Sequence, residues 1–225
     1  IMSSARMYLI ALSVLVEENP DIAKKINGII AWHVGDQKWV ADLKQGKVYE
    51  GTCAKPGVTL TMAEKDFVSL FDGTGNAQSL FMSGKIKMKG NMGLVMKLQQ
   101  LTKLAEGGIS AKVLFAVLGD IIATNPDLIK KINGIYQWVI NDTKTGTQKW
   151  VVDVKNAPGS VYAGDVTKGK AGVTLTIKES DFVSLMTGQA NAQSLFMGGK
   201  IKLKGNMGLA MKLGQLQSMA PKAKL

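Results

Sequence analysis

The 225-residue sequence contains few of the residues that build reactive or metal-binding centres. It has one cysteine, Cys53, and one histidine, His33. A single cysteine cannot close an intramolecular disulfide, and zinc sites in proteins need several Cys or His ligands. The sequence therefore argues against a disulfide scaffold, a metal site and a Ser-His-Asp hydrolase, and we expect no cofactor.

Arginine and aromatic residues are also scarce, although the chain is basic. The net charge is +11, but Arg6 is the one arginine among 28 basic residues, and aromatic residues make up 6% of the chain. Nucleic-acid-binding proteins rely on arginine and on aromatic side chains that stack with bases. We therefore expect no nucleic-acid partner.

Long hydrophobic runs are absent as well. Hydrophobic residues make up 46% of the chain, the ordinary share for a globular protein, but no run reaches the roughly 18 apolar residues of a transmembrane helix. Residues 7–16 alone resemble a short signal peptide, yet their counterpart at residues 111–123 lies inside the chain. We expect both segments to be helices of the fold.

The sequence is internally duplicated. Asn19-Pro20-Asp21 recurs 106 residues later as Asn125-Pro126-Asp127, and from Val58 to Leu98 the offset is constant at 115, with 31 of 41 positions identical. A period of this length indicates a duplicated domain rather than a solenoid. We predict a first domain at residues 1–106, a short glycine-containing linker at 107–110 and a second domain at 111–225.

Each copy has the same order of periodic segments. In the first copy, helical spacing of apolar residues predicts helices near residues 5–18, 66–71 and 92–104. Strands are predicted near residues 30–34, 39–43, 58–62 and 85–89, with a short one at Val48. Thr61 and Glu64 have capping-box spacing, and Asn76 is placed to cap another short helix. The short spacing of the first four strands favours an antiparallel meander. The predicted fold class is α+β, with one sheet of five strands and helices over one face.

One motif is more specific than the rest of the sequence. Gly-Lys-x-Lys-x-x-Gly-Asn-Met-Gly-Leu occurs at residues 84–94 and again at 199–209. With the segments at 150–156, 173–177, 180–182 and 186–188, it makes each copy resemble the sterol carrier protein type 2 family, also called non-specific lipid-transfer protein. The resemblance implies a five-stranded mixed sheet covered by helices and enclosing an apolar tunnel for fatty acids, fatty acyl-CoA and sterols. Two copies in one chain depart from the common single-domain arrangement.

Apolar residues on the inward faces are the predicted tunnel lining. In the first copy they are Trp32, Trp39, Leu60, Met62, Phe67, Leu70, Phe81, Ile86, Met88, Leu94, Leu98 and Leu101. In the second copy they are Trp138, Trp150, Leu175, Ile177, Phe182, Leu185, Phe196, Ile201, Leu203, Leu209, Leu213 and Leu216. Many of these positions suit ordinary core packing equally well.

Polar residues at the tunnel mouth are candidates for orienting a lipid head group. The candidates are Gln78, Gln193, Lys85, Lys87, Lys200 and Lys202. The lysine ammonium groups suit a carboxylate or a CoA phosphate, although their alternation with apolar residues also fits the solvated face of a strand.

The final tripeptide suggests a cellular location. Ala223-Lys224-Leu225 belongs to the small-basic-Leu class of C-terminal peroxisomal signals, which an import receptor reads. We therefore expect a peroxisomal carrier of long-chain fatty acid, fatty acyl-CoA or sterol that meets anionic membrane surfaces transiently. A second hypothesis is a module that presents acyl-CoA to peroxisomal β-oxidation enzymes. An enzyme using Asp42 and Asp153 is a third hypothesis, but both residues fit turns better than catalytic positions.

Overall fold

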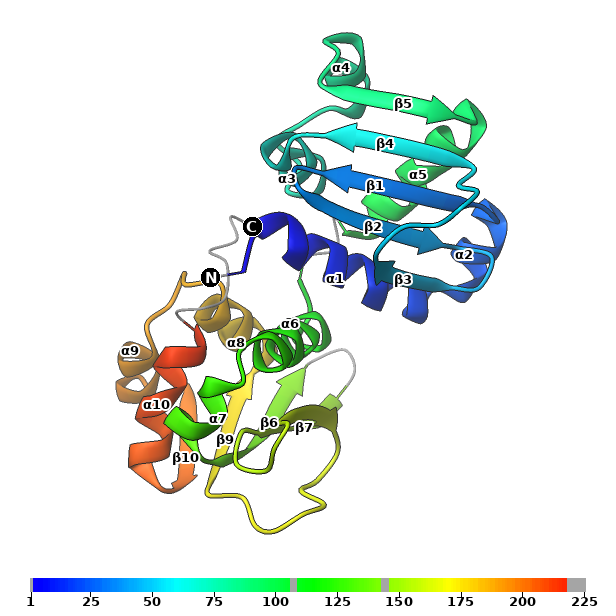
Figure 1. The fold of residues 1–225 in the computed structure, drawn as a ribbon. Coiled ribbons are helices and arrows are strands. Elements are labelled where there is room, and N and C mark those ends of the chain that lie inside the picture. Colours follow the sequence, from blue (N-terminus) through cyan, green and yellow to red (C-terminus); the bar gives the residue numbers. More distant parts are fainter. Residues whose placement is uncertain (1, 106–108, 143–145, 218–225) are drawn as a thin grey trace. The chain divides into compact units, whose positions relative to one another are not determined.

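The computed structural model describes residues 2–105, 109–142 and 146–217, which divide into two compact units at residue 110 (Figure 1). The first unit contains α1 (Ser4–Glu18), α2 (Pro20–Ile26), β1 (Ile29–Val34), β2 (Gln37–Asp42), β3 (Lys47–Glu50), β4 (Val58–Met62), α3 (Glu64–Phe71), α4 (Ala77–Met82), β5 (Ile86–Gly90) and α5 (Met92–Ala105). The second contains α6 (Ala111–Thr124), α7 (Asp127–Ile132), β6 (Ile135–Asp142), β7 (Gly146–Asp153), β8 (Ser160–Ala163), β9 (Val173–Lys178), α8 (Glu179–Met186), α9 (Ala192–Met197), β10 (Ile201–Gly205) and α10 (Met207–Gln217). None of these described helices is long and apolar enough to span a membrane.

Each unit is a five-stranded mixed sheet with its long helices packed on one face (Figure 1). The strand orders are β3-β2-β1-β4-β5 and β10-β9-β6-β7-β8. The expected antiparallel meander is wrong for the fourth strand, because β4 pairs in parallel with β1 and β9 in parallel with β6. Period-2 alternation fixes the face on which a side chain lies but not the neighbouring strand. The mixed sheet that the family resemblance implies is confirmed.

The first hairpin of each sheet preserves one register despite an insertion. Trp32 pairs with Trp39 in the first unit, and Trp138 pairs with Trp150 in the second. The strands of the hairpin lengthen from six residues each to eight each, so the added residues extend its far end. The tryptophan pair therefore keeps its place against the helices in both units.

One predicted cap forms and another does not. The side chain of Asn76 caps α4 by accepting a hydrogen bond from Ser79 N–H, as expected. The capping box at Glu64 is wrong, since no side chain caps α3. Instead Glu64 Oε1 accepts a hydrogen bond from Ala5 N–H at 3.1 Å, and Glu179 Oε1 accepts one from Ala111 N–H at 2.7 Å. Each carboxylate therefore satisfies one open backbone N–H at the start of α1 or α6, whose N-caps are Ser3 and Ser110.

The Gly-Asn pair of the repeated motif makes the turn from the last strand to the last helix. Gly205 has φ of +117°, and a Cβ there would lie 2.5 Å from the carbonyl oxygen of Gly172. The next residue, Asn206, donates its backbone N–H to that same oxygen at 2.9 Å. Only glycine fits this close approach of two backbones.

Candidate functional site

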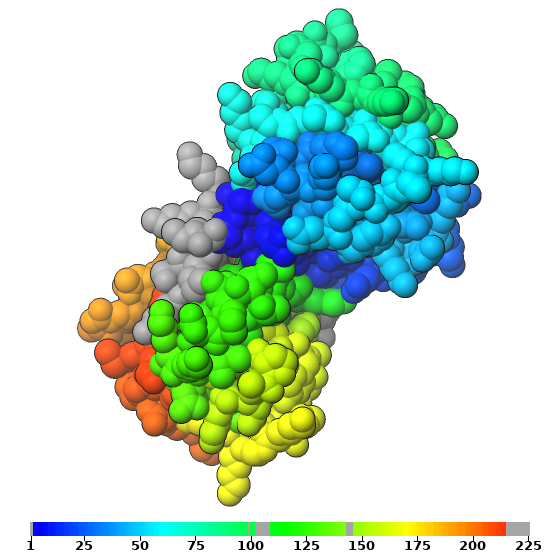
Figure 2. All heavy atoms as spheres, in the orientation of Figure 1, coloured from blue at the N-terminus to red at the C-terminus, as the bar shows by residue number. Residues whose placement is uncertain are grey.

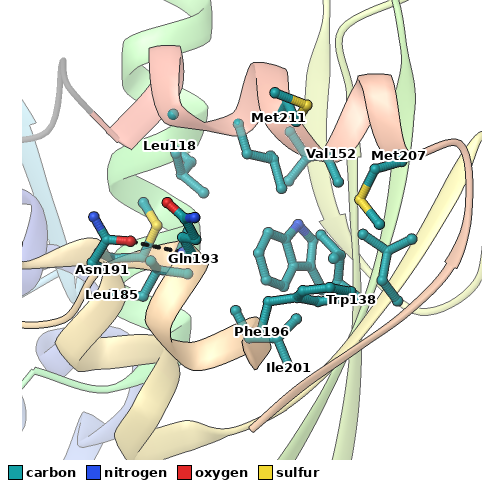
Figure 3. Close-up of a pocket in the computed structure, with 17 residues that line it drawn as sticks. Leu118, Trp138, Val152, Leu185, Asn191, Gln193, Phe196, Ile201, Met207 and Met211 are labelled. Atoms are coloured by element: carbon teal, nitrogen blue, oxygen red, sulfur yellow. Dashed lines mark hydrogen bonds between the residues drawn. The ribbon is translucent and has the colours of Figure 1, made fainter. Parts of the chain in front are cut away.

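A cavity of about 580 Å³ lies in the second unit, between the inner face of its sheet and helices α6, α8, α9 and α10 (Figure 3). This volume falls within the usual range for small-molecule sites. The lining residues are Leu118, Trp138, Val152, Leu175, Leu185, Met186, Asn191, Ala192, Gln193, Phe196, Ile201, Leu203, Met207, Ala210, Met211, Leu213 and Gly214.

Strand alternation and helix periodicity together make the cavity wall apolar. On β10, Ile201 and Leu203 face the cavity, because alternate residues of a strand share one face. On α10, Met207, Ala210 and Met211 recur at helical spacing and form the opposite wall. The wall therefore offers mainly dispersion contacts and burial of apolar surface to a ligand.

A small polar group stands at the start of α9. Asn191 Oδ1 accepts a hydrogen bond from Gln193 N–H at 2.7 Å, which caps the helix (Figure 3). Neither the Gln193 side-chain amide nor Asn191 Nδ2 has a hydrogen-bond partner within the described part of the chain. The buried indole N–H of Trp138 also lacks a partner there. These groups could bind a polar end of an otherwise apolar ligand.

The structure brings several predicted lining residues of the second copy together. Those on the cavity wall are Trp138, Leu175, Leu185, Phe196, Ile201, Leu203 and Leu213, joined by the head-group candidate Gln193. Four others do not border the cavity. Phe182 stacks on Phe115, as does Trp150, and Ile177 is 1% exposed. Leu209 packs against Gly134 and Gly172. The side chain of Leu216 lies outside the described part.

The first copy places equivalent residues on the same inner faces. Trp32, Leu60, Leu70, Phe81, Ile86, Met88 and Leu98 correspond in sequence to the seven wall residues of the second copy. Trp39, Met62, Phe67 and Leu101 are buried, and Leu94 packs against Gly28 and Gly57. Several wall positions differ in size, because Val95, Phe71 and Ala41 stand where the second copy has Ala210, Met186 and Val152.

None of the four lysine candidates belongs to the cavity wall. Lys200 Nζ is 3.0 Å from Asp181 Oδ1, and Lys85 Nζ is 3.9 Å from Asp66 Oδ1. Lys87 and Lys202 alternate with inward residues of β5 and β10, so they are on the opposite face of the sheet. Gln78 is exposed near the start of α4, as Gln193 is near the start of α9.

Sequence reasoning missed wall residues on five elements, α9 with Ala192 among them. They include Leu118 of α6, Val152 of β7, Met186 of α8, and Met207, Ala210 and Met211 of α10. The helical spacing of Met207, inside the repeated motif, and Met211, just after it, was the available signal. Nothing in the sequence indicated that α6 contributes a side chain, and for β7 the sequence pointed to Trp150 rather than to Val152.

The carboxylates considered for catalysis serve turns instead. Asp42 Oδ1 accepts hydrogen bonds from the backbone N–H groups of Lys44 and Gln45. Asp153 is held in the same way by Lys155 and Asn156. Burial opposes ionisation of Asp153, but these hydrogen bonds, that of the Asn156 side chain and the charge of Lys168 outweigh it and lower its pKa. Both residues therefore have the turn role that the sequence predicts.

Tyr136, which the first copy lacks, contacts α10, one of the helices that border the cavity. Its hydroxyl donates a hydrogen bond to Leu209 O of α10 at 2.9 Å, and burial raises its pKa to about 12. The first copy has Ile30 at this position, which cannot make this bond. The start of α10 is therefore tied to β6 by a contact that α5 lacks.

Known proteins resemble both halves of the chain in sequence. The sequence pattern of the SCP-2 sterol transfer family matches residues 11–103 and again 117–218. "Peroxisomal multifunctional enzyme A" of Dictyostelium discoideum is 47% identical over 114 residues, which cover 50% of this chain and 25% of that protein. "Sterol carrier protein 2" of Oryctolagus cuniculus is 44% identical over 126 residues, which cover 55% of this chain and 23% of that protein.

The matched regions are about a quarter of the length of these curated relatives. Among solved structures, sterol carrier protein 2 of Yarrowia lipolytica in its apo form is 36% identical, with a TM-score of 0.41, over 44% of this chain and 90% of that one. The two family matches together span most of the sequence. The chain therefore belongs to the SCP-2 sterol transfer family, with two copies of the family's domain in tandem.

Proposed function

We propose that each of the two domains, residues 1–106 and 111–225 joined by 107–110, binds a long-chain fatty acid, fatty acyl-CoA or sterol and passes it to membranes or enzymes. The observation that carries this proposal is the apolar cavity of about 580 Å³ in the second unit, with a few polar groups at the start of α9 and on Trp138. Membership of the SCP-2 sterol transfer family supports the same class of ligand.

The energetics favour a ligand recognised by shape and apolar area. Burying one methylene contributes about 0.8 kcal/mol, so a chain of about 14 methylenes gains on the order of 11 kcal/mol before ordering costs. Gln193 and its counterpart Gln78 would then orient the polar end rather than supply the affinity. Lys85, Lys87, Lys200 and Lys202 would attract anionic head groups from outside the cavity.

The proposed setting is peroxisomal. The supporting observations are the signal-like tripeptide Ala223-Lys224-Leu225, which lies outside the described residues, and similarity to relatives named as peroxisomal multifunctional enzymes. An import receptor would bind the tripeptide, and anionic membrane surfaces would be transient partners. Fusing residues 218–225 to a fluorescent protein tests the signal, with Leu225→Ala as the control that should stay outside peroxisomes.

A second candidate function is presentation of acyl-CoA to peroxisomal β-oxidation enzymes. It is favoured by one observation, that about half of this chain aligns to a quarter of a multifunctional enzyme. In this case, palmitoyl-CoA would bind more tightly than palmitate, and the chain would raise the turnover of an added β-oxidation enzyme.

Ligand titration of the delipidated full chain tests the carrier function. We expect saturable binding of palmitate, palmitoyl-CoA or a sterol at micromolar concentration. Failure of all three to bind would refute the proposal. Because we propose no catalytic role for Asp42 and Asp153, turnover that disappears when both are replaced by Asn would instead establish an enzyme.

A further inference from the structure

One buried position of the cavity wall carries a flexible side chain in the second copy and an aromatic ring in the first. Two of the helices that border the cavity, α9 and α10, adjoin on the surface, where Figure 2 shows them in orange and red. Met186 of α8 lines the same cavity but is 6% exposed. Phe71 of α3 stands at the equivalent position of the first copy and is 7% exposed. Met186 would therefore contact the buried part of a ligand rather than its solvent-facing end.

The ring of Phe71 is held by three other aromatic rings. Its centroid is 4.7 Å from that of Phe67, 5.7 Å from that of Tyr8 and 6.5 Å from that of Trp32. Trp32 is the counterpart of the wall residue Trp138. Aromatic pairs at these separations attract one another, and side chains in a close-packed interior keep to one rotamer. The ring of Phe71 therefore has little freedom to move away from a ligand.

The second copy places a ring behind the wall instead. Phe115 of α6, where the first copy has Leu9, stacks on Trp150 and Phe182 with centroids 4.7 and 4.9 Å away. None of these three aromatic residues of the second copy belongs to the cavity wall. The wall position itself is left to Met186, whose unbranched side chain adapts its shape to what it contacts.

Two further differences between the walls offset one another in volume. Val95 has an isopropyl group where Ala210 has a methyl group, and Ala41 reverses this exchange at the position of Val152. Of these three exchanges, the ring of Phe71 is the one that is not offset. It also replaces a side chain that can yield by one that is fixed, so it affects rigid ligands most.

We propose that the residue at this position selects the class of lipid that each domain accepts. The second domain, with Met186, accepts rigid sterols as well as flexible acyl chains, whereas the first, with Phe71, accepts acyl chains and excludes sterols. A fused-ring sterol cannot bend around a fixed aromatic ring, and forcing it past the ring overpacks the interior. An acyl chain avoids the ring by changing its own rotamers. This inference rests on the proposed carrier function.

Counting the lipids bound to the full chain by native mass spectrometry tests this selection, with cholesterol and palmitate as separate probes. We expect the wild-type chain to carry one cholesterol. Met186→Phe should weaken cholesterol binding about tenfold or more, and palmitate binding less, so that the bound cholesterol is lost. Phe71→Met should add a second cholesterol in the first domain.

Matched variants make the test specific to this position. Met186→Leu keeps an aliphatic side chain of similar volume and should retain the bound cholesterol. Val183→Phe adds a ring to the same helix at a residue that does not line the cavity, and it should also retain cholesterol. Phe71→Leu repeats the test of the first domain if Phe71→Met does not fold. Circular dichroism checks that each variant is folded.

The outcomes separate this inference from the carrier function. A wild-type chain that binds palmitate but carries two cholesterols, or none, would overturn the selection and leave the carrier function standing. Cholesterol that stays bound in Met186→Phe would overturn the role of Met186, and an unchanged cholesterol count in Phe71→Met and Phe71→Leu would overturn that of Phe71. Failure of the wild-type chain to bind cholesterol, palmitate or palmitoyl-CoA would refute the carrier function itself.

Discussion

Filling the cavity of the second domain should reduce by one the number of lipids that the chain binds. Ala210 lies on α10, faces the cavity and is partly buried, so its replacement by phenylalanine directs a benzyl ring into the space that the ligand would occupy. The substitution leaves the neighbouring wall residues of α10, Met207 and Met211, unaltered. Ala210→Phe is therefore a perturbation of cavity volume rather than of fold.

The expected loss follows from the methylenes that the ring displaces. A ring of this size takes the place of about three or four methylenes of an acyl chain within the cavity. At about 0.8 kcal/mol for each, the binding free energy falls by about 3 kcal/mol, which is roughly a hundredfold weaker affinity. The first domain is unaffected because Ala210 belongs to the second unit.

Native mass spectrometry of the full chain with palmitate measures the number of lipids directly. We expect Ala210→Phe to carry one palmitate fewer than the wild-type chain at the same ligand concentration. Thr174→Phe is the matched control, because Thr174 adjoins the wall residue Leu175 on β9 but faces away from the cavity. Equal palmitate occupancy in wild type and Ala210→Phe would refute the assignment of the cavity as the lipid site.

Three further substitutions test the physical account of the fold. Gly205→Ala should lower the free energy of unfolding of the second domain by about 2–3 kcal/mol, because its Cβ meets Gly172 O at a positive φ. Glu179→Ala should cost about 1 kcal/mol in urea unfolding through loss of the bond to Ala111 N–H. Tyr136→Phe should cost about 1 kcal/mol at neutral pH through loss of its buried hydrogen bond. Burial raises the pKa of Tyr136 to about 12, so the stability that its protonated form contributes is present below about pH 10 and declines towards pH 12. The phenylalanine variant should lack this part of the alkaline decline.

Each of these predictions has a matched comparison. Gly146→Ala also places a Cβ at a positive φ, of +81°, but meets no atom within 4 Å, so a cost as large as that of Gly205→Ala would contradict the backbone-contact argument. Glu179→Gln keeps an acceptor oxygen and should preserve most of the stability. If Tyr136→Phe unfolds between pH 10 and 12 as the wild-type chain does, ionisation of Tyr136 is not responsible for the decline.

The sequence by itself determined the duplication and most of the local structure. Periodicity placed the helices and strands because burial on one face imposes a spacing of about 3.6 or 2 residues. Asn76 was identified as a cap because its side chain acts within four residues of itself. Repetition of one motif in both copies indicated the family and with it the mixed sheet.

The tertiary structure decided what depends on contacts between distant segments. The parallel pairing of β1 with β4 joins residues about 28 positions apart, which alternation cannot specify. Glu64 binds the Ala5 N–H at the start of α1, 59 residues away in sequence, rather than capping its own helix, and local spacing cannot specify such a contact. The cavity is likewise bounded by α6, β7, α9 and α10, and the gap left between their side chains depends on packing in three dimensions. The sequence thus predicted which residues face inward. Only the tertiary structure showed which of them line the cavity and which are packed in the core behind it.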